Sequence, residues 1–490
     1  MRATSTRTSP ASPTPSTARI RSTPRDAGLQ RTGPPVRWRL QSRGMAVTSA
    51  KRNSPLWAPD RRAATVGLLL LVTLAAFEAM GVSTAIPTLV RDLRGEALYA
   101  WVFTMMLATQ VVGNVVSGRV SDRRGPAPML VLGPVLFALG LVVAGTAGSM
   151  TQLLIGRALQ GFGGGAQIVA LYVMIAMVFP DRDQPAVFGA LAAGWVVPSM
   201  IGPTAAGLLT QYLSWRWIFL GLAPLVLLGW VLILAVLRRL PPFEPQPSSP
   251  HRGLTPAAIA AAVGLAALSW AGDHRDLVGI LVALAGFAAL LPAVLVLLPR
   301  GTLLFRRGLP SVVLARGLMS AAFIGSEAFL PLVLQQVHGL TPAVAGVPLT
   351  FAAVGWWLGS WWQARFPDVS RALVMRWGFL IIMFALALVT LVAPSWGPAW
   401  LAAPAWAISG LGMGLATACT SVLVLRLSPP SDRGFNSSAL QLSDLIGQSV
   451  SICLGGVLVA LLGPTAGWAP LNLLLIAVCL LGAWPISRRA

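Results

Sequence analysis

Three carboxylic acids stand inside long apolar runs of the sequence: Glu78, Glu327 and Asp444. If each run forms a helix, a rise of about 1.5 Å per residue puts these acids roughly 21, 24 and 15 Å from the cytoplasmic ends of their helices. The hydrocarbon core of a bilayer is about 30 Å thick, so all three would lie inside it. An unpaired charge there costs several kcal/mol, and such residues usually mark an ion or substrate path. We therefore predict proton carriers or cation-binding groups. A neutral acid that hydrogen-bonds a neighbouring helix is the alternative.

One arginine stands in a similar position. Arg157 belongs to the run Leu153-Leu154-Ile155-Gly156-Arg157-Ala158-Leu159-Gln160-Gly161-Phe162-Gly163-Gly164-Gly165, about one or two turns inside the expected outer end of a helix. An arginine within the membrane must find an acid, a carbonyl or water. We expect Arg157 to exchange between Glu78 and water as protons move; a fixed structural ion pair is the alternative. The glycines of the run favour close helix packing over phosphate binding.

Membrane-spanning helices would position these residues. The chain is 56% hydrophobic and 10% charged, whereas soluble proteins are typically about 25% charged. Fourteen apolar runs are predicted as spans: 64–89, 99–118, 128–148, 150–179, 185–210, 216–237, 254–272, 277–298, 310–336, 341–363, 371–393, 397–425, 434–462 and 466–486. Twelve spans, without the weaker pair at 254–272 and 277–298, is the alternative. The predicted fold class is an all-α polytopic membrane protein.

The predicted organisation has four parts: a basic tail over 1–62, a six-helix bundle over 63–237, a linker with a central helix pair over 238–309, and a second six-helix bundle over 310–490. The tail is rich in Ser, Thr, Pro and Arg and should be disordered; an organellar transit peptide is a weaker interpretation. Either Met1 or Met45 could be the first residue. If the tail is inside, most loop arginines are cytoplasmic, as the positive-inside rule requires. We therefore expect both termini in the cytoplasm.

The charge pattern also excludes several classes of protein. The net charge of +21 does not indicate nucleic-acid binding, because 13 of the 36 basic residues lie in the tail and most others in short loops. Lys51, the only lysine, has no phosphate-loop context, so any pumping must draw on an ion gradient or a partner. His251, His274 and His338 do not cluster with other metal ligands. We predict no metal site, no cofactor and no enzyme active site.

The segment Gly118-Arg119-Val120-Ser121-Asp122-Arg123-Arg124-Gly125 joins two of the spans. A link this short makes the two helices antiparallel neighbours, and glycines at both of its ends let the chain turn. Asp122 can accept hydrogen bonds from a helix N-terminus or pair with an arginine. We interpret Gly118, Asp122, Arg123 and Gly125 as an ionic latch that holds one conformation.

The span at 185–210 contains two prolines and two glycines in ten residues, namely Pro198, Gly202, Pro203 and Gly207. Proline removes a backbone hydrogen bond and kinks a helix, and glycine leaves a groove for a neighbouring helix. We expect this helix to be bent and closely packed.

These three segments, in this order, resemble signatures of the major facilitator superfamily. The 118–125 loop is similar to the family's loop motif, although Pro126 and Ala127 replace two basic residues. The 153–165 run is similar to the fourth-helix signature, whose arginine is implicated in proton coupling. The Pro198–Gly207 segment is similar to the motif of the family's exporters, with Ala206 in place of one glycine. Fourteen spans point to the fourteen-helix drug:proton antiporters, which often carry an acid in the first span.

The resemblance implies that two bundles rock about a central cavity and export small hydrophobic or cationic compounds across the plasma membrane in exchange for protons, as a monomer. It implies proton coupling through Glu78 and Arg157, with Glu327 and Asp444 as a cation-attracting or second proton site. Gln160, Trp195 and Trp356 are candidate cavity residues; packing or lipid contact is the alternative for the tryptophans. An importer on the same fold, or a receptor or scaffold without transport, are the rival functions.

Overall fold

The computed structural model describes residues 55–57, 61–180, 183–238, 253–272, 274, 276–366, 368–429 and 432–483. Most of the predicted tail, and residues 239–252 of the predicted linker, lie outside these residues. Every regular element among the described residues is a helix. Helices are the expected form of apolar runs in a bilayer, where each backbone polar group must be hydrogen-bonded within its own segment.

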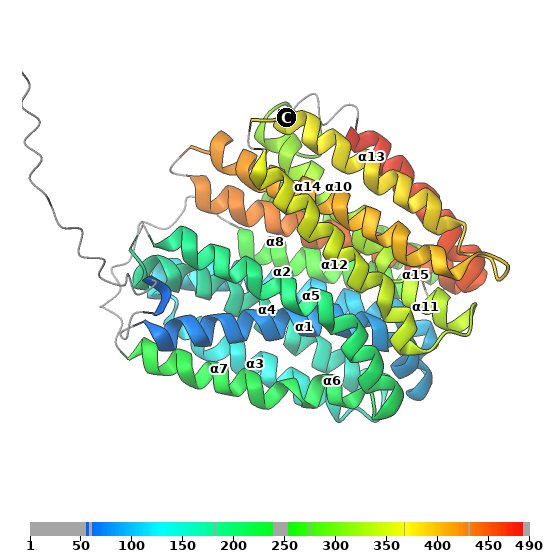
Figure 1. The fold of residues 1–490 in the computed structure, drawn as a ribbon, viewed down its shortest axis with the longest axis horizontal. Coiled ribbons are helices and arrows are strands. Elements are labelled where there is room, and N and C mark those ends of the chain that lie inside the picture. Colours follow the sequence, from blue (N-terminus) through cyan, green and yellow to red (C-terminus); the bar gives the residue numbers. More distant parts are fainter. Residues whose placement is uncertain are drawn as a thin grey trace, which may run out of the picture. The chain divides into compact units, whose positions relative to one another are not determined.

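Seven helices, α1 to α7, form the first bundle (Figure 1). They are α1 (Arg62–Asp92), α2 (Tyr99–Arg124), α3 (Ala127–Gly145), α4 (Met150–Val178), α5 (Gln184–Tyr212), α6 (Arg216–Leu220) and α7 (Leu222–Leu237). α4 packs against α2 and α3, and α1 packs against α5 and α7. α6 and α7 together occupy one predicted span, which is interrupted at Gly221.

Two helices, α8 (Leu254–Gly272) and α9 (Leu277–Leu297), form the central pair and pack against each other. α8 also contacts α2 of the first bundle and α15, which lies near the end of the chain. The central pair therefore lies beside a seam where these two distant parts of the sequence meet (Figure 1).

Six helices form the second bundle: α10 (Leu309–Glu327), α11 (Leu330–Gln336), α12 (Pro342–Arg365), α13 (Arg371–Thr390), α14 (Ala402–Leu427) and α15 (Arg433–Leu481). α14 packs against α12 and α13, and α10 packs against α15. α10 and α11 share one predicted span but are separated by Ala328 and Phe329.

Twelve helices of the described chain are long and apolar enough to cross a membrane. One of these is α15, whose 49 residues include non-helical Gly463 with φ 82°, and about 20 residues suffice for one crossing. α15 therefore supplies the last two predicted spans. α5 is not among the twelve, but it has 29 residues without a charged side chain. With α5 and both halves of α15, the described helices account for all fourteen predicted spans.

The two bundles meet along two seams, α5 with α12 and α2 with α15. The hydroxyl of Tyr99 donates a hydrogen bond to the carbonyl of Ala328 at 2.6 Å. The side chain of Gln335 donates from Nε2 to the carbonyl of Thr84 at 3.0 Å and accepts from the hydroxyl of Thr88 at 3.2 Å. These bonds lie near the end of α1 and the start of α2, which is the outer end in the predicted orientation.

Candidate functional site

Glu78 of α1 and Arg157 of α4 form an ion pair inside the first bundle, through Nη1 of the arginine and Oε1 of the acid. Nη1 also donates to Oε1 of Gln160 at 2.9 Å, and Nε donates to the carbonyl of Val102 at 3.0 Å. Only 3% of the arginine side chain and none of the glutamate side chain is exposed. The structure thus brings together the two residues that the sequence suggested as partners and adds Gln160 to them.

Two polar atoms of this cluster, Oε2 of Glu78 and Nε2 of Gln160, are buried without a hydrogen-bond partner among the described residues. A buried polar atom left unpaired costs about 1–3 kcal/mol. The free carboxylate oxygen can accept a proton, whereas the guanidinium of Arg157 cannot lose one. The cluster therefore has one partner that can change its charge and one that cannot.

Glycines on α4 allow the close approach that builds this cluster. A Cβ at Gly161 would lie 2.1 Å from the carbonyl oxygen of Met106 on α2, and one at Gly163 would lie 2.5 Å from the backbone nitrogen of Phe137 on α3. Any larger side chain would push these helices apart. The contacts agree with the helix-packing interpretation of the glycine run.

A second ion pair lies in the second bundle. Nη2 of Arg316 on α10 donates to Oδ2 of Asp444 on α15 at 2.7 Å, and the hydroxyl of Ser320 donates to Oδ1. Nη1 of Arg316 lies 3.4 Å from the carbonyl of Thr417 on α14. The two charged side chains are 16% and 17% exposed, so this pair is more accessible than the first.

Sequence reasoning missed Arg316. The sequence could have indicated this residue, because Arg316 is the only arginine in the apolar run 310–336. Like Arg157, an arginine within the membrane needs an acid, a carbonyl or water as its partner. Because Arg316 already pairs with Asp444, that carboxylate is not a lone negative charge available to a cationic substrate.

Glu327, at the end of α10, lies in an aromatic cluster instead of an ion pair. Its Oε2 accepts a hydrogen bond from the indole nitrogen of Trp406 at 3.0 Å. The ring of Phe323 stacks on Trp406 at 5.5 Å and meets Trp356 edge-on at 5.8 Å between ring centroids. Trp356, a candidate cavity residue, is thus packed into this cluster, whereas Trp195 on α5 is 39% exposed.

The predicted latch is only partly as expected. Gly125 ends α2 with φ 78°, a conformation that favours glycine, so its predicted role in the turn is confirmed. Gly118 does not lie in the turn, contrary to the prediction: α2 continues to Arg124, and a Cβ at Gly118 would meet nothing within 4 Å. The side chains of Asp122 and Arg123 are exposed, and neither side chain has a hydrogen bond or ion pair with any described residue.

The four residues of the predicted exporter motif lie within α5, which includes Pro198 and Pro203 without a break. A Cβ at Gly207 would lie 2.6 Å from the backbone of Ala343 on α12, and one at Gly346 on α12 would lie 2.6 Å from the carbonyl of Pro203. Gly202 faces α1 at ordinary contact distance. The close contact between α5 and α12 therefore depends on Gly207 and Gly346.

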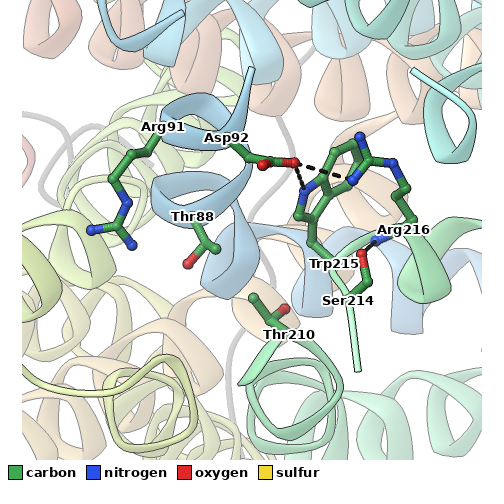
Figure 2. A pocket seen from close by; sticks show the side chains of 7 residues that line it. All are labelled: Thr88, Arg91, Asp92, Thr210, Ser214, Trp215 and Arg216. Carbon is green, nitrogen blue, oxygen red and sulfur yellow. Dashed lines mark hydrogen bonds and ion pairs between the residues drawn. The ribbon is translucent and has the colours of Figure 1, made fainter. Parts of the chain in front are cut away.

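A pocket of about 410 Å³ lies where α1 ends and α6 begins (Figure 2). In it, Oδ2 of Asp92 accepts hydrogen bonds from the indole of Trp215 at 3.0 Å and from Arg216 at 3.1 Å. A second pocket of about 290 Å³ lies between α2, α8 and α15 and includes Ser269 and Cys453. Neither pocket includes Gln160, Trp195 or Trp356. Within the described ranges, no three His, Cys, Asp or Glu residues are grouped to hold a metal ion.

Comparison with known proteins places these features in a family. The family model described as Major Facilitator Superfamily matches residues 68–403. An uncharacterized MFS-type transporter of Mycobacterium tuberculosis is 30% identical over 84% of the chain, but the match spans only 62% of that relative's length. Multidrug resistance protein 3 of Bacillus subtilis is 25% identical over 84% of the chain and 81% of its own length.

Solved structures share the fold at lower identity. A peptide transporter POT in complex with sulfate is 17% identical, with a TM-score of 0.65 over 87% of this chain and 95% of that one. A bacterial homolog of the human lysosomal transporter Spinster, in an inward-facing and unoccupied conformation, is 15% identical, with a TM-score of 0.63 over 88% of this chain and 97% of that one. The helical fold, the membrane-spanning segments and the family match agree, and the chain belongs to the major facilitator superfamily.

Proposed function

We propose that this protein exports small hydrophobic or cationic compounds from the cytoplasm in exchange for protons, across the plasma membrane and with both termini inside. The observation that carries the proposal is the buried pair of Glu78 and Arg157. A proton that reaches the free Oε2 of Glu78 neutralises the acid and leaves Arg157 held by Gln160 and the carbonyl of Val102. Proton binding then changes the contact between α1 and α4, which is what coupling to a conformational change requires.

The positions of the contacts between the bundles support substrate binding from the cytoplasm. Tyr99, Thr84, Thr88 and their partners join the bundles at the outer end in the predicted orientation. At the opposite end of α2, the side chain of Asp122 is exposed and makes no hydrogen bond or ion pair with a described residue. We infer that this conformation is closed outside and faces inward, and that the latch of Asp122 and Arg123 forms in the outward-facing state.

Two observations support export over import. The α5 segment with Pro198 and Pro203 packs closely on α12, as expected from the resemblance to the exporter motif. The relative from Bacillus subtilis is described as a multidrug resistance protein. Import on the same fold is the second candidate, since solved peptide transporters share the helical arrangement.

The test uses inside-out vesicles with an acidic interior, containing equal amounts of wild-type protein or the Glu78→Gln variant. A panel of cationic and neutral hydrophobic dyes is added, and a pH-sensitive fluorophore reports proton release from the interior. We expect at least one dye to dissipate the gradient in wild-type vesicles and not in Glu78→Gln vesicles, because the glutamine cannot carry a proton. Glu96→Gln, which changes an exposed acid outside the cluster, is the matched control and should behave as wild type.

The other outcomes decide between the alternatives. Equal proton release by wild type and Glu78→Gln would remove Glu78 from the proton path. A dye that enters right-side-out vesicles together with protons, and does not accumulate in inside-out vesicles, would replace export by import. Dye binding without gradient-dependent movement in either vesicle type would favour a receptor.

A further inference from the structure

We propose that the Arg316–Asp444 pair is a displaceable recognition site for zwitterionic substrates, with Arg316 taking a carboxylate and Asp444 taking the positive group. This inference rests on the proposed transport function and replaces cationic compounds by zwitterionic ones as the preferred charged substrates. No such role follows from the sequence motifs, none of which includes Arg316.

The hydrogen-bond inventory of the pair points to the missing acceptor. Asp444 uses both carboxylate oxygens, one toward Arg316 and one toward Ser320. A guanidinium has five N–H donors, and Nε of Arg316 is buried without a partner. The contact from Nη1 to the carbonyl of Thr417 is long, at 3.4 Å. Arg316 therefore has an unused donor, which an anionic oxygen would satisfy, and the Asp444 carboxylate, with about four lone-pair sites and two of them used, can still accept from a positive group.

Position and exposure make the pair available to a substrate. Arg316 lies seven residues from the start of α10 and Asp444 eleven from the start of α15, which is roughly 10 and 16 Å along their helices. Charges at this depth face a water-filled path or another protein group, because exposure to hydrocarbon is costly. The two side chains are 16% and 17% exposed. By contrast, Arg157 and Glu78 of the first pair are 3% and 0% exposed, which leaves no access for a substrate.

Charge balance selects the substrate class. A lone cation would bind Asp444 and leave Arg316 without its partner. A lone anion would bind Arg316 and leave Asp444 without its partner. Breaking a buried pair in this way leaves an uncompensated charge and is strongly unfavourable. A zwitterion replaces one internal ion pair by two ion pairs with the substrate, and the net charge of the site stays the same. The arrangement therefore favours compounds that carry both a carboxylate and a positive group.

The test measures binding to the purified full chain in lipid nanodiscs by fluorescence anisotropy. The probes are rhodamine 110, a zwitterion with a carboxylate, and its methyl ester rhodamine 123, a cation of nearly the same shape. We expect wild type to bind rhodamine 110 at least tenfold more tightly than the ester. Arg316→Gln should remove this preference and Arg316→Lys should keep part of it. Arg433→Gln, an exposed arginine at the start of α15, is the matched control and should change neither affinity.

A single substitution in the pair could impair folding, so the double variant Arg316→Gln/Asp444→Asn, which has no unpaired charge, is measured as well. It should remain folded by thermal unfolding and bind the two dyes equally. Equal binding of the dyes to wild type, no binding of rhodamine 110, or a carboxylate preference that survives in the double variant would overturn the inference. The assay uses no proton gradient. Loss of the preference with intact dye-dependent proton release would therefore overturn this inference alone, whereas selective binding without proton release would count against the exporter.

Discussion

The buried pair of Glu78 and Arg157 predicts an unequal response to removing its two charges. Glu78→Gln leaves the guanidinium of Arg157 as a cation in a site where only 3% of its side chain is exposed, and arginine cannot lose its proton. Removing one partner of a buried ion pair typically costs about 3–5 kcal/mol of unfolding free energy. Arg157→Met leaves Glu78, which can take up a proton and become neutral, so the cost falls to that of an unsatisfied polar group, about 1–3 kcal/mol.

The double variant Glu78→Gln/Arg157→Met should be close to wild type in stability, because replacing both charges by groups of similar volume is often neutral or stabilising. The assay is a double-mutant cycle with unfolding in mixed detergent micelles, followed by tryptophan fluorescence. We expect a coupling free energy of about 3 kcal/mol or more, from the difference between one uncompensated charge and none. Additive effects of the two single changes, or a larger loss for Arg157→Met than for Glu78→Gln, would refute the reasoning.

Two further predictions concern the contact between the bundles. Gly207→Leu should lower the free energy of unfolding by about 1–3 kcal/mol through overpacking, since even a Cβ would lie 2.6 Å from the backbone of Ala343. Thermal unfolding measures this loss. Gly118→Leu is the control, because a Cβ at Gly118 meets nothing within 4 Å. Gln335→Leu removes two hydrogen bonds to α1, worth about 0.5–1.5 kcal/mol each. Spin-label distances between the C-terminal ends of α1 and α11 should therefore shift toward longer values. An unchanged distance distribution would show that these bonds do not hold the two helix ends together.

Much of the architecture follows from the sequence alone. Runs of about 20 apolar residues have no alternative to helices in a bilayer, so the number of spans can be read from composition. Gly125 could be assigned to the turn between α2 and α3 because few other residues adopt its positive φ. Glu78 and Arg157 could be matched because each carries a charge that must be neutralised, and few opposite charges are available within the spans.

Other features depend on how the helices pack. The end of α2 was misplaced because Gly118 can sit in a helix where no neighbour approaches it, and no local signal distinguishes that case from a turn. The sequence did not indicate a partner for Asp444. The packing of α10 against α15 supplies one, because it brings Nη2 of Arg316 to 2.7 Å from Oδ2 of Asp444. The environment of Glu327, an indole donor instead of a charge, also comes from a contact between distant segments.

The sequence by itself therefore determines which residues need partners, because the cost of an isolated charge in the membrane is a property of the residue and its depth. Only the tertiary structure decides which partner each one has. Pairing depends on which helix faces meet, and those faces are set by side-chain packing over segments more than a hundred residues apart, as with Arg316 and Asp444.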